Sequence, residues 1–146
     1  MGFLSAPRFP ARKWSGGPPA AGDGKRAISV GTLGTLMSLI PDAAVAVDSS
    51  ARIVSVNDQA EAMFGYAAGS LVGVPVETLV PERVRRRHRQ HRLEFMASPQ
   101  ARPMGSGLKV TGCRLDGITL PLDISLAPVV CAGEQLVVAA IRDMTA

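Results

Sequence analysis

The chain contains little cysteine, and it lacks the residue groupings on which most enzymes depend. Two of its 146 residues are cysteines, Cys113 and Cys131, and their spacing matches neither a paired metal-ligand motif nor a disulfide framework. We therefore expect a reducing, cytoplasmic environment. No Ser/His/Asp triad and no pair of carboxylates occurs in a context suited to catalysis, so we expect that the chain is not an enzyme.

Long uninterrupted apolar segments are also missing. Residues 28–47 carry almost no charge, but Pro41 and Asp42 interrupt them, which excludes a membrane-spanning helix there. Pro7 and Pro10 break the apolar N-terminal run that a signal peptide would need. We expect no association with a membrane.

The positive charge of the chain is concentrated at its N-terminus. The net charge is +4, and residues 1–26 account for all of it with five basic residues and one acidic residue. The rest of the chain is neutral, which weakens an argument for nucleic-acid binding from overall charge. Residues 1–27 are also rich in proline and glycine, so we expect a flexible, basic N-terminal arm.

The predicted elements after this arm indicate an α+β domain. An amphipathic helix is expected over residues 28–41, where apolar residues recur with helical spacing at Leu33, Leu36, Met37 and Ile40. Alternating β-branched segments and turn residues then predict a five-stranded antiparallel sheet with short helices and one long helix on one face. Its strands are expected at 43–47, 52–57, 108–114, 118–130 and 135–143. Asp116-Gly117 predicts a hairpin with a type I′ turn.

The long helix, residues 83–95, has the most unusual composition in the chain. It contains both histidines and six arginines, at positions 83, 85, 86, 87, 89 and 92. Val84, His88, His91 and Phe95 fall within a sector roughly 60° wide, and the arginines occupy the rest of the circumference. Because arginine resists burial, we expect the two histidines to face the interior of the fold.

Several interpretations of this helix stay open from the residues alone. The histidines can be partly buried side chains bonded to backbone or water, or they can bind a ligand. His88 and His91 are three residues apart, as in some metal sites, but no third ligand is evident. The arginines can form a solvated face, a dimer contact or a surface for nucleic acid, although no aromatic residues are interleaved with them.

Four phrases of the sequence, in order, resemble the PAS domain. They are IPDAAVAVDSSARIVSVNDQAEAMFGY (40–66), LVGVPVETLVP (71–81), VTGCRLDGITLPLDIS (110–125) and AIRDMT (140–145). The resemblance implies a PAS fold over residues 42–146 and a sensory, signal-transducing input module. Such modules form homodimers and regulate an output domain or partner, for example the histidine kinase of a two-component system. We expect the apolar stripe of the helix at 28–41 to contact a second copy of the chain.

The second half of the chain is most similar to haem-binding PAS domains of the FixL type. The similarity rests on the long helix, the loop phrase RPMGSG (102–107) and the hairpin phrase TGCRLDG (111–117). It implies haem b as a cofactor, with His88 as the axial ligand to iron and His91 beside it in the pocket. Ile124 and Leu126 would line the gas-binding face.

Two positions depart from that pattern. Leu108 replaces the arginine that donates a hydrogen bond to bound oxygen, so a site here would discriminate less against CO or NO. Arg102 is the only counterpart of the basic residues that bind the haem propionates. A flavin photoreceptor of the LOV type is excluded, because no cysteine lies between Asp58 and Gly112.

The residues and the resemblance leave three functions open. The first is a sensory PAS module that binds an unknown small ligand or acts through protein contacts. The second is a haem-based gas or redox sensor with His88 as its ligand. The third is a basic adaptor that uses the helix from Arg83 to Arg92 to hold nucleic acid or an acidic partner.

Overall fold

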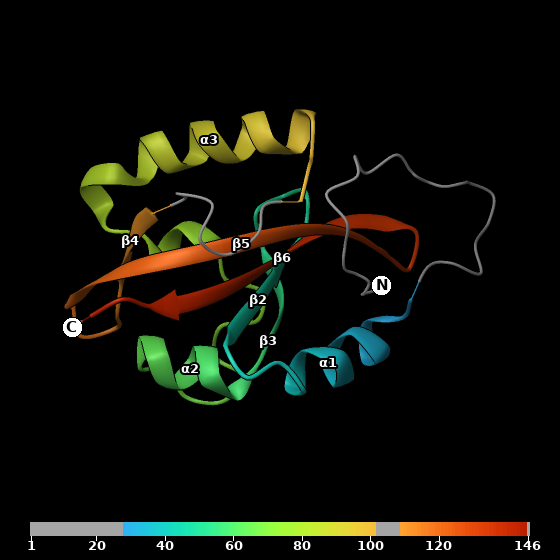
Figure 1. The fold of residues 1–146 in the computed structure, drawn as a ribbon, viewed down its shortest axis with the longest axis horizontal. Coiled ribbons are helices and arrows are strands. Elements are labelled where there is room, and N and C mark those ends of the chain that lie inside the picture. Colours follow the sequence, from blue (N-terminus) through green and yellow to red (C-terminus); the bar gives the residue numbers. More distant parts are fainter. Residues whose placement is uncertain (1–27, 102–108, 146) are drawn as a thin grey trace.

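The computed structural model describes residues 28–101 and 109–145. The predicted arm at 1–27 and the predicted site residues Arg102 and Leu108 lie outside the described residues. The elements run in the order α1 (Val30–Ser38), β2 (Ala43–Val47), β3 (Ile53–Val56), α2 (Asp58–Phe64), η2 (Val76–Leu79), η3 (Glu82–Val84), α3 (Arg85–Ala97), β4 (Lys109–Cys113), β5 (Thr119–Cys131) and β6 (Glu134–Asp143) (Figure 1).

The sheet has five strands in the order β3-β2-β6-β5-β4, and every neighbouring pair is antiparallel. β6 lies at the centre, where it pairs with β2 and with the long strand β5. The chain therefore returns from β3 at one edge, through the helices, to β4 at the other edge. This arrangement confirms the predicted α+β class and the predicted sheet.

One face of the sheet carries the main hydrophobic core. Apolar side chains of β2, β5 and β6 on this face pack against α2 and the segment after it, with Phe64 and Leu71 fully buried. α2 begins at the capping residue Asn57 and ends at Gly65, whose φ of 79° lies in the left-handed region. α3 lies on the far side of the sheet from α1 (Figure 1).

α1 packs on the opposite face of the sheet. Leu33 and Met37 are buried there together with Ala44, Ala46, Val129, Cys131 and Leu136. Two residues of the apolar stripe that we expected to contact a second copy, Leu33 and Met37, therefore cover the sheet of their own domain. The spacing of the apolar residues predicted the helix, but it could not show which surface the helix covers.

The hairpin between β4 and β5 differs from the predicted type I′ turn. A type I′ turn requires positive φ at both central residues, whereas in this turn Gly117 has φ 89° and Asp116 is not among the described residues with positive φ. Gly117 N donates to Arg114 O, and Arg114 N donates to Ile118 O. The turn is thus a three-residue hairpin that ends in a left-handed glycine. Ala132 and Gly133 have positive φ instead, at the β5–β6 turn.

Candidate functional site

A pocket of about 700 Å³ lies between α3 and the core face of the sheet. Its sheet side is apolar, and its helix side carries polar and charged side chains. The sheet contributes chiefly Val110, Leu122, Ile124, Leu126, Val137, Ala139 and Ile141, and α3 contributes Arg87, His88, His91, Arg92, Glu94, Phe95 and Met96. The volume falls within the range of pockets for small molecules and cofactors.

The pocket exists because α3 does not pack closely on the sheet. None of the residues of α3 is buried, although the helix is 13 residues long. Pro81 precedes the short turn η3, and the Arg85 Nε donates a hydrogen bond of 2.9 Å to the carbonyl of Val80. These contacts fix the N-terminal end of the helix. The rest of the helix forms the outer wall of the pocket.

His88 is held by a carboxylate from η2. Its Nδ1 lies 3.0 Å from Oε2 of Glu77, and the same oxygen accepts a hydrogen bond of 3.0 Å from the Nε of Arg92. Glu77 is 8% exposed, so its charge needs both partners. Burial raises the pKa of the Glu77 carboxyl, but the hydrogen bonds and charge of Arg92 and His88 outweigh burial and hold the pKa below its ordinary value.

Arg92 corrects the prediction that the arginines all face outward. Its side chain is 17% exposed and lies on the Glu77 side of the helix. Arg85 also contacts the fold through Val80, so two of the six arginines are engaged within the domain. A helical wheel does not show buried partners on neighbouring segments. Glu77 is such a partner for Arg92.

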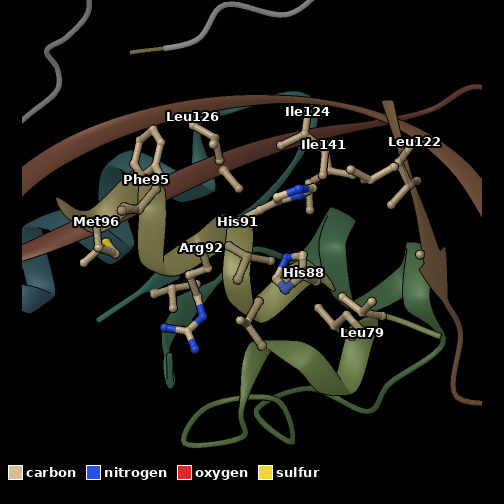
Figure 2. Close-up of a pocket in the computed structure, with 18 of the residues that line it drawn as sticks. Leu79, His88, His91, Arg92, Phe95, Met96, Leu122, Ile124, Leu126 and Ile141 are labelled. Atoms are coloured by element: carbon tan, nitrogen blue, oxygen red, sulfur yellow. The ribbon is translucent and has the colours of Figure 1, made fainter. Parts of the chain in front are cut away.

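His91 lines the pocket but is exposed, so the prediction that both histidines are interior holds for it only in part. Its ring points from α3 toward Ile124 and Ile141 of the sheet, whereas His88 lies nearer Leu79 (Figure 2). Ile124 and Leu126 line the same pocket. The structure thus brings four of the six predicted site residues together, and Arg102 and Leu108 lie outside the described residues.

Sequence reasoning missed Glu77 and the inward role of Arg92. The signal available was weak: a single acid within the otherwise apolar segment LVGVPVETLVP (71–81). Such a carboxylate needs a partner if it is buried, and the cations of the next helix were the natural source. Glu77 lies in η2 and Arg92 in α3, so the periodicity of a single helix could not pair them.

Within residues 28–101 and 109–145 no group of three or more His, Cys, Asp or Glu side chains is arranged to hold a metal ion. A metal bound by protein side chains alone is therefore not supported by the described part of the chain. In the same residues, no helix is long and apolar enough to cross a membrane.

The fold is that of an α+β domain with a pocket beneath its long helix, and comparison with known families identifies its kind. Residues 41–146 match the PAS domain model, and the chain belongs to the PAS domain family. Sensor protein FixL of Bradyrhizobium diazoefficiens is 31% identical to it over 113 residues, which are 77% of this chain and 22% of FixL. The chain thus spans about a fifth of the length of that relative.

Solved structures agree on the fold. The PAS domain of an HTR-like protein from Haloarcula marismortui has a TM-score of 0.63 at 22% identity, over 78% of this chain and 96% of that one. The LOV protein of Rhodobacter sphaeroides has a TM-score of 0.65 at 14% identity, over 78% and 65% of the two chains. The resemblance to PAS domains and to FixL expected from the sequence is thereby confirmed.

Proposed function

We propose that this PAS domain is a sensory input module that binds a small ligand in the pocket between α3 and the sheet. The pocket itself is the observation that supports the proposal. It combines an apolar sheet wall with a polar helix wall, which suits a ligand with a largely apolar body and a few polar groups. Ligand binding would change how α3 sits on the sheet, because no residue of this helix is buried in the core.

Native mass spectrometry and absorption spectroscopy of the purified chain test this function. We expect a co-purified or added ligand to raise the mass under native conditions and to leave when the chain is denatured. Loss of the extra mass in a variant whose pocket is filled would place the ligand in this pocket. A ligand that binds this filled variant as well as the parent would contradict the assignment.

The contact between His88 and Glu77 favours haem b as the ligand. A histidine that ligates a metal usually donates its other ring N–H to a carboxylate, and His88 makes this bond to Glu77. His88 would then bind iron through Nε2, and the apolar sheet residues would enclose the porphyrin. Bound haem would supply an iron centre that binds diatomic gases or changes oxidation state.

Titration with hemin tests the haem proposal. The parent chain and an Arg89→Ala variant should take up one equivalent and show a Soret band, because Arg89 is exposed and does not line the pocket. His88→Ala should lose the band while circular dichroism shows an intact fold. Equal, weak and non-stoichiometric uptake by all three proteins would exclude His88 as the ligand.

The signal must also reach a partner, and we propose a homodimer that forms through α1. Leu33 and Met37 of α1 are buried in the domain, but Val30, Leu36 and Leu39 are 53%, 37% and 73% exposed. A helix that packs on the sheet and still exposes large apolar residues suits a second contact. Regulation of an output domain and a cytoplasmic location belong to the same proposal.

Light scattering tests the dimer. Leu36→Asp with Leu39→Asp should convert it to monomer without unfolding the domain. Val72→Asp with Leu93→Asp is the matched control, because these residues are 53% and 57% exposed and belong to other segments of the chain. If the control pair dissociates the dimer and the α1 pair does not, the interface lies elsewhere.

A further inference from the structure

Glu77 is a buried acid in an otherwise apolar part of the core. Its residue is 8% exposed, and the neighbouring core consists of apolar side chains such as Leu79. A buried carboxylate is costly unless it is paired, and an apolar residue of similar size would avoid that cost. Arg92 alone would balance its charge. The second bond, to His88, therefore calls for an explanation.

That bond determines which nitrogen of His88 carries the proton. An ionised carboxylate only accepts hydrogen bonds, so at 3.0 Å the Nδ1 of a neutral His88 must be the donor. The lone pair of the ring is then on Nε2, which points away from Glu77. His88 lines the pocket, whereas Glu77 is not one of its lining residues. The basic nitrogen of His88 is consequently the one that a ligand in the pocket can reach.

We propose that Glu77 is a positioning residue that holds His88 as the Nδ1–H tautomer, so that Nε2 is presented to an electron-accepting ligand in the pocket. The proposal rests on the proposed function, with ferric haem as the ligand. It assigns a role to a residue that touches no ligand itself and acts only through His88.

Arg92 is the second part of the arrangement. It donates to the same Oε2 at 3.0 Å, and its side chain is 17% exposed, which is less than the 32% of His88. It neutralises the carboxylate and limits how strongly Glu77 attracts the Nδ1 proton. Both contacts of Glu77 come from one face of α3, so the carboxylate also fixes the rotation of the helix about its axis relative to η2.

The tautomer can be measured without any ligand. Long-range ¹H–¹⁵N correlation spectra of the hemin-free chain, recorded where the histidines are neutral, distinguish protonated from unprotonated ring nitrogens. We expect Nδ1 of His88 to be protonated in the parent chain. In Glu77→Leu and Glu77→Gln we expect a mixture or a shift to the Nε2–H form that free neutral histidine prefers.

His91 and Glu82 provide the controls. His91 is exposed, so its signals should not change in the Glu77 variants, and Glu82→Leu at an exposed position should leave His88 unchanged. Circular dichroism establishes that each variant is folded. An Nε2–H tautomer for His88 in the parent chain, or an unchanged Nδ1–H tautomer in Glu77→Leu, would overturn the proposal.

Hemin titration of the same variants separates this proposal from the haem function. Loss of a carboxylate partner typically weakens metal binding by about 10–100-fold, and we expect that loss for Glu77→Leu but not for Glu82→Leu. If the parent binds hemin through His88 and the Glu77 variants bind it equally well, Glu77 has no positioning role. If the parent takes up no hemin but the tautomer depends on Glu77, the haem function fails and the positioning of His88 stands.

Discussion

Asn57 and Ala44 are joined by two hydrogen bonds at the start of the sheet. Asn57 N donates to Ala44 O at 3.1 Å, and Ala44 N donates to the Asn57 side-chain Oδ1 at 2.9 Å. The same Oδ1 caps α2, and Nδ2 donates to the backbone carbonyls of Met37 and Asp42. One side chain therefore connects the end of α1, strand β2 and the start of α2.

The first prediction follows from this connection. Asn57 is 4% exposed, so Asn57→Ala leaves several buried backbone groups without partners, and we expect it to lower the free energy of unfolding by about 2–4 kcal/mol. Urea denaturation measures the change. Ser29→Ala, which removes the exposed cap of α1, is the control and should cost about 1 kcal/mol or less. Equal losses in the two variants would show that the buried connections contribute nothing.

Gly112 is required by the packing of β4 rather than by its backbone conformation. A Cβ at this position would lie 2.6 Å from Leu122 Cδ1 and 3.0 Å from Phe64 Cε1, and both residues are buried. We expect Gly112→Ala to destabilise the domain by about 1–3 kcal/mol through overpacking, measured as a lower Tm. Gly34→Ala is the matched control, because a Cβ in that turn of α1 meets only Ser55 at 4.0 Å, and it should be neutral or stabilising by up to about 1 kcal/mol.

Gly117 is required by its backbone conformation rather than by packing. A Cβ there would meet nothing within 4 Å, but φ is 89°. The strain of a β-branched residue in this conformation should make Gly117→Val cost about 1–3 kcal/mol, with Gly117→Asn tolerated better. Thermal unfolding compares the two. A Tm for Gly117→Val that matches the parent would mean that the turn relaxes without cost.

The same turn predicts a pH dependence. The backbone N–H of Ile118 donates to Asp116 Oδ1 at 3.0 Å, and this bond, aided by Arg114 and opposed by slight desolvation, lowers the pKa of Asp116 below its ordinary value of 3.8. A carboxyl whose pKa is lower in the folded state stabilises the fold above its unfolded pKa, and that stability is lost as the pH falls through the folded pKa. Asp116→Asn should remove this part of the acid sensitivity in urea melts below about pH 4. Identical pH profiles for parent and variant would contradict the assignment.

The sheet and the turns were predictable because their signals are local. β-Branched residues that alternate with polar ones identify strands, and glycines such as Gly65 and Gly133 occur where the backbone needs positive φ. The type of the turn at Gly117 was not predictable, because Asp-Gly suits both a type I′ turn and a three-residue loop with a left-handed glycine. The flanking strands decide between them.

The candidate site was predictable only in outline. Helical spacing placed His88 and His91 on one sector of α3, and both line the pocket. The spacing could not show that the helix stays off the sheet, because that depends on contacts from outside the helix. The carboxylate of Glu77 was the missing contact, and it draws Arg92 toward the fold.

The pocket itself supplies the last prediction. Ala139 of β6 lines it, and Ala140, the next residue of the same strand, faces the other side of the sheet. Ala139→Leu adds apolar atoms to a cavity of about 700 Å³, so the ligand-free protein should keep or raise its Tm while hemin uptake falls. Ala140→Leu makes the same enlargement outside the pocket and should leave hemin uptake unchanged. If Ala139→Leu binds hemin as tightly as Ala140→Leu, the ligand does not occupy the space between α3 and the sheet, and the function proposed for that space is wrong.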